Sequence, residues 1–281
     1  MSEFIMPSRE QDSNKGTFGK VLNFSGSGNY IGAAYLSTLG ALKSGAGYVA
    51  LASEKKVLNS VSILLPEAVL LSRTEGLKSL DKYTVCLIGC GLGQKRNSVN
   101  LFKKVIEGKR KNIDTPLSPL TSGEINSFVI DADGLNILSS LSKINLPQNT
   151  ILTPHPLEAS RLLGVEVNEV LQDLEGSAKK LSKKYNCVVA LKTHRTVVCE
   201  RDRIYVNQHG NSALAKAGTG DVLAGIISGL LAQKMTPFES AKLAVYLHSR
   251  AGELASEDLT EYSPLASDIL NYLPNAIKEI L

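Results

Sequence analysis

The chain has 281 residues, of which 43% are hydrophobic, enough to bury a sizeable core in one large domain or two small ones. The net charge is only +4 and basic residues form no dense run, so we expect no nucleic-acid partner. Four cysteines lack metal-binding spacing, and we expect reduced thiols. No apolar run is long enough for a bilayer and no secretory signal is evident. We therefore expect a cytoplasmic protein without a membrane partner.

The first ordered elements predict an α/β fold with a parallel sheet. Residues 1–14 are polar and are expected to form a flexible tail, and no linker divides residues 15–281, which we predict to be a single domain. A strand at Val21–Phe24 precedes a helix at about Gly32–Ser44 and a strand at Tyr48–Ala52. Strand, helix and strand in succession are typical of parallel pairing.

Two later strands end in residues suited to binding. Thr84–Ile88 runs into the glycine-rich stretch Gly89–Gly93, which allows a ligand to approach the backbone closely. After a helix and a long expected loop at 108–127, a strand from Phe128 ends in Asp131 and Asp133. Two such carboxylates suit a metal, a ribose hydroxyl or a helix cap. The simplest interpretation is that Asp133 caps a helix from Leu135.

The stretch Thr150–Glu158 is unusual because a short strand ends in Thr-Pro-His-Pro. His155 lies between two prolines at the carboxyl end of a strand, the edge at which open α/β sheets bind ligands. A lone histidine is often structural, but this placement favours a site. Glu158, in the first helical turn, is predicted to cap that helix or to face a metal and phosphate.

The second half of the chain predicts further helices and one hairpin. A long helix fits 168–184, and a buried strand at 187–192 leads to a hairpin of 196–200 and 203–207. A helix over 237–253 carries His248, expected at its polar edge, and one or two helices close the chain over 266–281.

One glycine loop stands out as a phosphate-binding element. Ala217–Gly220 delivers a single carboxylate, Asp221, at the start of an apolar helix. Backbone N–H groups and a helix N-terminus attract anions, and one aspartate beside them suits the acceptance of a hydroxyl proton in phosphoryl transfer. The alternative is a helix capped by aspartate, and the loop alone does not decide between them.

The arrangement of motifs supports a phosphate site over other chemistry. Every motif follows a predicted strand, so all converge on one sheet edge. The spacing of Gly26, Gly28 and Gly32 departs from the dinucleotide fingerprint, which disfavours a Rossmann dehydrogenase. Neither a Walker sequence nor a serine-hydrolase elbow is present.

Nine stretches together resemble those of a known family: Lys15–Gly19, Gly32–Ala34, Leu42–Gly47, Ile88–Gly93, Asp131–Asn136, Leu152–Pro156, Leu214–Gly225, Tyr246–His248 and Ala266–Asp268. With these stretches in the same order over roughly residues 14–273, the chain resembles the ADP/ATP-dependent NAD(P)H-hydrate dehydratase family of the ribokinase-like superfamily. The resemblance implies a ribokinase-like three-layer α/β/α sandwich with a mostly parallel central sheet.

The resemblance also implies a repair reaction. Members of the family remove water from hydrated NADH or NADPH, converting ADP to AMP and phosphate or ATP to ADP and phosphate. By position, Asp221 is the base, and Gly218, Thr219 and Gly220 form the anion hole. The residues implied to contact the hydrated dinucleotide are Ala33, Gly91, His155 and Asp221. Those implied to contact the nucleotide are Lys192, Thr193, His194, Arg195, Thr196 and Gly220.

Cofactors and partners follow from the same resemblance. ADP or ATP is the expected co-substrate, with Mg²⁺ expected for phosphoryl transfer and Glu158 as a weak candidate to orient it. The expected assembly is a homo-oligomer, a tetramer by resemblance, acting with a separate NAD(P)H-hydrate epimerase. Cys90 stands where the family often has proline, and Thr193 where it usually has glycine. The alternatives are a ribokinase-like small-molecule kinase and a non-catalytic nucleotide sensor.

Overall fold

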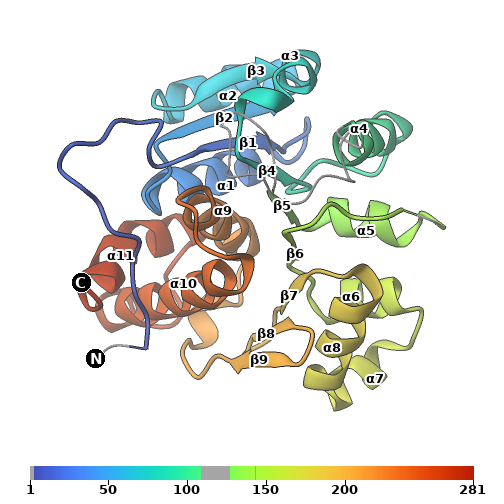
Figure 1. The fold of residues 1–281 in the computed structure, drawn as a ribbon. Helices are drawn as coiled ribbons and strands as arrows, with labels where there is room; N and C mark the ends of the chain where they lie inside the picture. Colours follow the sequence, from blue (N-terminus) through green and yellow to red (C-terminus); the bar gives the residue numbers. More distant parts are fainter. Residues whose placement is uncertain (1–2, 109–126, 143) are drawn as a thin grey trace.

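A computed structural model describes residues 3–108, 127–142 and 144–281. Within them one sheet has the strand order β3-β2-β1-β4-β5-β6-β7-β8-β9 (Figure 1). Strands β1 to β7 pair in parallel, and β8 and β9 continue the sheet as an antiparallel hairpin. The predicted mostly parallel sheet and the predicted hairpin are confirmed.

The elements are β1 (Lys20–Phe24), α1 (Ile31–Lys43), β2 (Tyr48–Ser53), α2 (Lys55–Leu64), β3 (Val69–Ser72), α3 (Arg73–Lys78), η1 (Leu80–Lys82), β4 (Val85–Ile88), α4 (Arg96–Glu107), β5 (Ser127–Ile130), α5 (Asp133–Ser139), β6 (Thr150–Leu152), α6 (Pro156–Leu163), α7 (Val167–Gln172), α8 (Leu174–Tyr185), β7 (Val188–Leu191), β8 (Val197–Glu200), β9 (Arg203–Val206), η3 (Ser212–Leu214), α9 (Thr219–Ala232), α10 (Pro237–Leu259) and α11 (Ala266–Lys278). The four elements between Glu54 and Tyr83, which are α2, β3, α3 and η1, were not predicted.

Helices cover both faces of the sheet, which confirms the expected three-layer sandwich (Figure 1). Side chains alternate between the faces along a strand, so Val21 and Leu22 of β1 belong to different cores. Helices α1, α9, α10 and α11 contribute to the core on one face. Helices α4, α5, α6 and α8 contribute to the core on the other. The carboxyl ends of β1, β4, β5, β6 and β7 therefore share one edge.

Glycines allow α9 to pack directly against the backbone of α1. A Cβ added to Gly225 would lie 2.3 Å from the carbonyl oxygen of Ser37, and one added to Gly229 would lie 2.4 Å from that of Ala41. Real Cβ atoms do not approach carbonyl oxygens so closely, so only glycine fits at these positions. The contact fixes the position of α9 relative to the sheet.

Two predictions about helices were wrong. Asp133 does not cap α5 but begins it, and its carboxylate accepts a hydrogen bond from the Gly93 backbone at 2.7 Å. The long helix over 168–184 is interrupted at Asp173, which caps α8 through a bond from Gly176 N at 2.8 Å. In both cases the carboxylate satisfies a backbone N–H that sequence periodicity does not reveal.

The position of His248 also differs from the prediction. Its helix, α10, extends to Leu259, and His248 is only 7% exposed. Burial lowers the pKa of this histidine to about 4. The side chain is therefore a neutral, buried imidazole and not a residue at the polar edge.

The segment that precedes β1 contacts the rest of the molecule. Phe4 stacks on Tyr246 of α10 with ring centroids 3.9 Å apart, and Glu3 pairs with Lys242 at 2.6 Å. The division into a tail at 1–14 and a domain at 15–281 stays a prediction. Nearly all of the loop expected at 108–127 lies outside the described residues.

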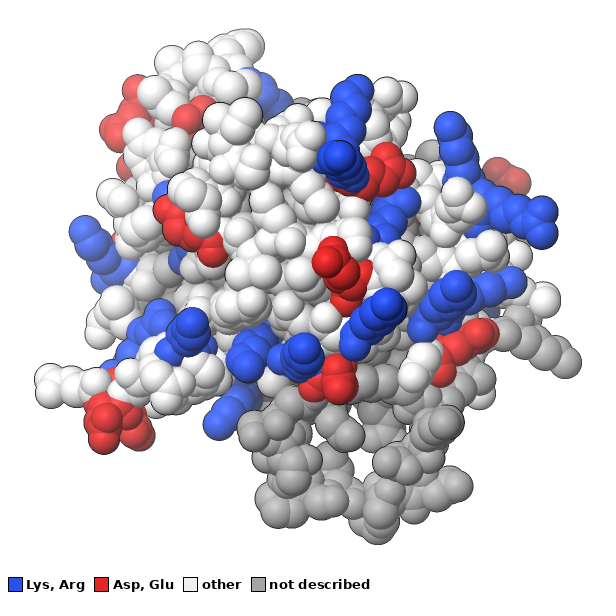
Figure 2. All heavy atoms as spheres, turned by 90° about the horizontal axis from the view of Figure 1, so that it is seen from above, with Lys and Arg blue, Asp and Glu red and all other residues white. Residues whose placement is uncertain are grey.

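The surface carries both signs of charge. On the face in Figure 2, lysines and arginines are interspersed with acidic residues over the described atoms. In the ranges 3–108, 127–142 and 144–281, no helix combines the length and apolar character needed to cross a membrane.

The contact between α1 and α9 predicts a large stability difference between two glycine variants. Gly225→Ala should lower the free energy of unfolding by about 2–4 kcal/mol, because the methyl group overpacks a backbone contact. Gly32→Ala on α1, where a Cβ would meet nothing within 4 Å, should be neutral or stabilise by up to about 1 kcal/mol. Urea unfolding at equal protein concentration measures both. Equal effects of the two variants would contradict the packing argument.

Candidate active site

The N-terminus of α9 forms a concave backbone loop. Gly218 precedes the helix with φ of 93°, a conformation that favours glycine. The Thr219 hydroxyl lies 2.9 Å from both the Leu214 and the Lys216 carbonyl oxygens, which holds the loop closed. In the described structure the N–H groups of Gly220 and Asp221 have no protein acceptor, whereas that of Thr219 bonds to Lys216 at 3.4 Å. The free N–H groups and the helix N-terminus suit an anion.

Asp221 lies in the first turn of α9, where a second carboxylate and a thiol surround it. The Cys90 sulfur and carboxylate oxygens of Asp131 and Asp221 lie within 4.8 Å of one another. Burial and the charge of Asp131 raise the pKa of Asp221 to about 6, although Cys90 and Lys192 oppose the shift. The side chain is thus mainly ionised at pH 7 and is a stronger base than an exposed aspartate.

Lys192 brings a positive charge beside the same loop. Its ammonium donates to Asp131 at 2.6 Å, and a Cβ added to Gly220 would lie 3.4 Å from its Nζ. Burial alone would lower the pKa of Lys192, but the carboxylates of Asp131 and Glu158 raise it. The ammonium therefore stays charged next to the glycine loop.

His155 and Glu158 hold the start of α6 together as a capping box. The His155 Nδ1 accepts from the N–H groups of Leu157 at 3.1 Å and Glu158 at 3.4 Å. Glu158 in turn accepts from His155 N at 2.9 Å. Because Nδ1 is an acceptor, the neutral ring carries its proton on Nε2, and burial followed by the Lys192 charge lowers the pKa of His155. The ring is 46% exposed, and its Nε2 lies 3.5 Å from a Glu158 carboxylate oxygen, so a ligand at this ring would share the N–H with Glu158.

Ala33 of α1 and Gly91 after β4 lie against each other. A Cβ on Gly91 would be 2.8 Å from the Ala33 Cβ and 2.6 Å from the Tyr30 Cβ, and the backbone has φ of 59°. A larger residue at either position would separate the two loops. The structure therefore brings together two residues that the sequence placed in one site.

A cavity of about 490 Å³ extends from the glycine loop. Lys192, Thr193, His194, Thr196 and Gly220 line it, but Arg195 does not. Arg195 instead participates in the turn, with its N–H bonded to the Thr193 hydroxyl at 3.2 Å. Sequence reasoning did not assign several further lining residues to the site: His209, Gly210, Asn211, Ser212, Leu214, Ala215, Leu223, Val245, His248 and Ser249.

The sequence contains a signal for some of these unassigned lining residues. Asn211–Ala215 directly precede the glycine loop in the chain, and His248 belongs to a stretch that carries the family resemblance. The segment at His209 and Gly210 is anchored to α10 by a bond from Gly210 N to Glu253 at 2.6 Å. That contact spans 43 residues, so local patterns do not predict it.

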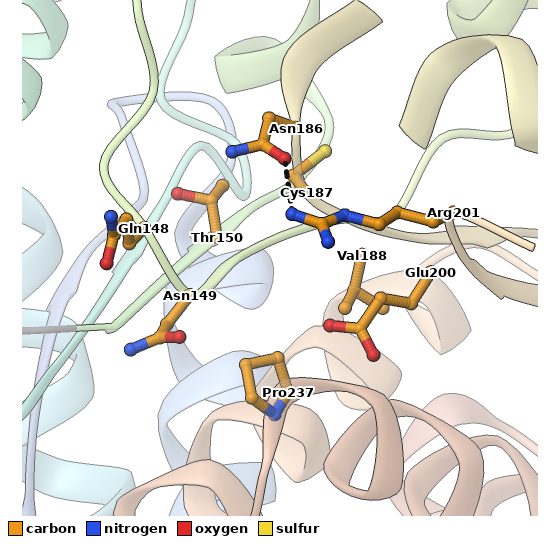
Figure 3. Close-up of a pocket in the computed structure, with 9 residues that line it drawn as sticks. All are labelled: Gln148, Asn149, Thr150, Asn186, Cys187, Val188, Glu200, Arg201 and Pro237. Atoms are coloured by element: carbon orange, nitrogen blue, oxygen red, sulfur yellow. Dashed lines mark hydrogen bonds between the residues drawn. The ribbon is translucent and has the colours of Figure 1, made fainter. Parts of the chain in front are cut away.

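A second cavity, of about 470 Å³, lies at the opposite edge of the sheet (Figure 3). Asn149 and Asn186 lie just before β6 and β7, and Arg201 follows the antiparallel β8, so all three mark the amino edge of the parallel strands. None of the predicted site residues lines it. The carboxyl edge, with its charged groups, is the candidate active site.

The sequence model of NAD(P)H-hydrate dehydratase matches residues 21–275. The chain belongs to the NAD(P)H-hydrate dehydratase family. It is 36% identical over 258 residues to the ADP-dependent (S)-NAD(P)H-hydrate dehydratase of Neisseria meningitidis, a match that covers 90% of this chain and 82% of the relative. By contrast, it spans about half of related bifunctional NAD(P)H-hydrate repair enzymes, for instance 52% of that from Moorella thermoacetica.

Solved structures of the family share the fold. The Bacillus subtilis ADP/ATP-dependent NAD(P)H-hydrate dehydratase, co-crystallised with ATP/Mg²⁺, superposes with a TM-score of 0.83 at 31% identity, covering 98% of this chain and 95% of that one. A ribokinase-like superfamily protein from Enterococcus faecalis gives a TM-score of 0.85 at 29% identity, covering 98% and 92%. The predicted family and the ribokinase-like fold are thus confirmed.

The described residues offer few protein ligands that suit the Mg²⁺ expected from the family resemblance. Among the described residues, the group with metal-ligand geometry is Cys90, Asp131 and Asp221, and it does not include Glu158. Burial raises the pKa of the Cys90 thiol, so it stays protonated, and the Lys192 ammonium already occupies Asp131. Mg²⁺ prefers phosphate, carboxylate and water oxygens. The role of Glu158 as a metal residue stays a prediction.

The raised pKa of Asp221 has a consequence for stability in this family member. The folded-state pKa, about 6, exceeds the ordinary value of 3.8, so ionised Asp221 destabilises the fold as pH rises from about 4 to about 6. Asp221→Asn should therefore raise the free energy of unfolding at pH 7 by about 1–2 kcal/mol, allowing for partial exposure.

Urea unfolding between pH 3.5 and 8 measures this effect. The gain should be largest above pH 6 and vanish near pH 4, whereas Asp202→Asn at the exposed hairpin turn should change stability by less than about 0.5 kcal/mol. A loss of stability in Asp221→Asn at pH 7 would contradict the proposed environment.

Proposed function

We propose that this chain dehydrates hydrated NADH or NADPH at the expense of ADP or ATP, with Asp221 as the base. The observation that carries the proposal is the position of Asp221 in the first turn of α9, at the free N–H groups of Gly220 and of Asp221 itself, where Gly220 lines the cavity. Membership of the family supplies the substrates, because relatives are named ADP-dependent (S)-NAD(P)H-hydrate dehydratases.

The proposed reaction has two steps. Asp221 accepts the proton of the ring hydroxyl while that oxygen attacks the terminal phosphorus of the nucleotide, forming a C–O–P linkage and releasing AMP from ADP or ADP from ATP. The ring nitrogen then expels phosphate as the C–O bond breaks, and loss of the neighbouring proton restores the double bond. The hydroxyl oxygen leaves in the phosphate.

Charge stabilisation is divided between the loop and Lys192. Phosphoryl transfer concentrates negative charge on the oxygens of the phosphoryl group. The N–H groups at the start of α9 and the anchored Lys192 ammonium approach this region from two elements. Such preorganised donors need little rearrangement during the reaction. Thr219 shapes the loop rather than supplying a free donor, since both its hydroxyl and its N–H bond within the loop.

Two regions around Asp221 provide for the two substrates. We assign the hydrated dinucleotide to the side formed by Ala33, Gly91 and His155, where the half-exposed ring of His155 offers a donor, its Nε2–H, beside the Glu158 carboxylate. We assign the nucleotide to the cavity formed by Lys192, Thr193, His194, Thr196 and Gly220. Arg195, outside the cavity lining, is expected to act through the shape of this turn.

The remaining partners follow from the family. The B. subtilis relative was co-crystallised with ATP/Mg²⁺, and we propose that Mg²⁺ arrives with the nucleotide, held mainly by phosphate oxygens and water. Because related repair enzymes are bifunctional, we propose a partner epimerase that supplies the correct hydrate epimer. A homotetramer in the cytoplasm remains the expected state.

The best alternative is a kinase that releases a phosphorylated alcohol. It would use the same loop and base, but it does not account for the family match over residues 21–275. The products distinguish the two: a dehydratase regenerates the reduced ring, and a kinase yields a stable phosphate ester.

The dehydratase activity can be tested directly. Hydrated NADH incubated with the protein and ADP or ATP should regain the absorbance of the reduced ring, and no recovery should occur without nucleotide. Asp221→Asn should lower kcat by at least about 10³-fold while the Kd for nucleotide changes less than about threefold. A phosphorylated product that accumulates without NADH would favour the kinase, and a mild loss of rate would exclude Asp221 as the base.

The role of His155 predicts unequal effects on the two substrates. His155→Ala should weaken binding of the hydrated dinucleotide more than that of ADP, by about tenfold against less than threefold. Because the ring also caps α6, His155→Asn serves as the control that retains a capping side chain. Calorimetric titration of both ligands measures the difference. If His155→Ala weakened the binding of ADP but not that of the hydrated dinucleotide, His155 would not belong to the dinucleotide side.

A further inference from the structure

Asp131, at the end of β5, is a buried carboxylate to which the reaction above gives no role. It is 1% exposed, yet it accepts three hydrogen bonds from three other segments. Lys192 donates at 2.6 Å, the Thr153 hydroxyl at 2.7 Å and the Cys90 thiol at 3.5 Å. Donors on both of its oxygens restrict the orientation of this carboxylate.

The bond to Lys192 fixes a cation beside the phosphoryl-binding loop. A lysine side chain has four rotatable carbons and loses considerable freedom when it is held in place. Here the ammonium lies against Gly220, so a swing of the chain would remove the positive charge from the loop. Asp131 opposes that swing, because its carboxylate is buried and lies 2.6 Å from the Lys192 ammonium.

The same carboxylate lies close to the base. Oxygens of Asp131 and Asp221, with the Cys90 sulfur, fall within 4.8 Å of one another. Two carboxylates at that separation disfavour each other's ionisation. The charge of Asp131 is, after burial, the main cause that raises the pKa of Asp221. Asp131 thus acts on both charged groups that phosphoryl transfer needs.

We propose that Asp131 is a positioning residue for phosphoryl transfer, which holds the Lys192 ammonium at the anion loop and places a second negative charge beside Asp221. This inference rests on the proposed function. In this role Asp131 makes no contact with the substrate. The Thr153 hydroxyl and the Cys90 thiol orient the carboxylate between its two targets.

Other charged and titratable groups around Asp221 determine the expected pH effects. They are Cys90 after β4, Asp131 after β5, Asp133 at the start of α5 and Lys192 after β7. Glu158 of α6, whose pKa burial raises to about 7, acts on Lys192 and Asp131. Asp131 and Asp133 raise the pKa of Asp221, and Cys90 and Lys192 lower it. Removing Asp131 or Lys192 must therefore move the titration of Asp221 in opposite directions.

The pH profile of kcat/KM for the hydrate tests the proposal. Asp131→Asn should move the acid limb to lower pH by about 0.5–1 unit, because the charge of Asp131 acts on Asp221 more strongly than that of Lys192. It should also lower the plateau by at least about tenfold, because Lys192 is no longer held at the loop. Lys192→Met should lower the plateau similarly but move the limb to higher pH. Asp133→Asn, the matched control, should give a smaller shift in the direction of Asp131→Asn, because Asp133 contributes least to the pKa of Asp221. A uniform loss of rate with an unmoved limb would show a merely structural role and would overturn the proposal.

Two additional measurements keep this test independent of turnover and of folding. Carbon-13 NMR titration of the Asp221 carboxyl requires no substrate, and its midpoint should fall in Asp131→Asn. Because that variant leaves Lys192 buried without its partner, the double variant Asp131→Asn/Lys192→Met provides a folded alternative, which near-ultraviolet circular dichroism verifies. In it, the Asp221 midpoint should lie below that of Lys192→Met alone.

The outcomes separate this inference from the proposed function. If the wild-type protein fails to dehydrate the hydrate, the proposed function is wrong, whatever Asp131 does to Asp221. If the wild-type protein is active but the Asp221 midpoint is the same in wild type and Asp131→Asn, the role of Asp131 is wrong and the dehydratase stands.

Discussion

The direct backbone contact between α1 and α9 is the constraint on which the site depends. Gly225 and Gly229 let α9 approach the carbonyl oxygens of Ser37 and Ala41 more closely than any residue with a Cβ would allow. The helix therefore has one position over the sheet, and its first turn presents Gly220 and Asp221 at the carboxyl edge. An apolar helix packed through flexible side chains would leave that edge less well defined.

The site concentrates charge in a partly buried space, and this feature links its stability to its chemistry. Asp131 and Asp221 lie close together with Lys192 as the nearby cation. The arrangement lowers the free energy of unfolding, because Asp221 is ionised at pH 7 although burial and the charge of Asp131 disfavour its ionised form. In the proposed reaction the same destabilisation makes Asp221 a better proton acceptor, so the cost to the fold and the gain in reactivity have one cause.

Much of the architecture was predictable from local patterns. Apolar runs bounded by glycine located the strands, and the order of strands and helices predicted the parallel sheet that carries Asp221, His155 and Lys192 to one edge. Local patterns failed where a partner lies far away in sequence. The bond between Lys192 and Asp131 spans 61 residues, and the burial of His248 depends on which side of α10 faces the cavity. The capping role of Asp173 was not predicted for a different reason: a continuous helix and a helix with a break have the same hydrophobic periodicity.

The central claim is that the ring hydroxyl of the hydrate attacks the nucleotide with Asp221 as its base. Hydrated NADH that carries oxygen-18 in this hydroxyl tests it most directly, with mass analysis of the phosphate released during turnover with ADP. We expect one oxygen-18 atom in each phosphate, because the hydroxyl oxygen leaves bonded to phosphorus. Unlabelled phosphate, with the oxygen-18 recovered in water, would show that the hydroxyl leaves without phosphorylation and would contradict the account.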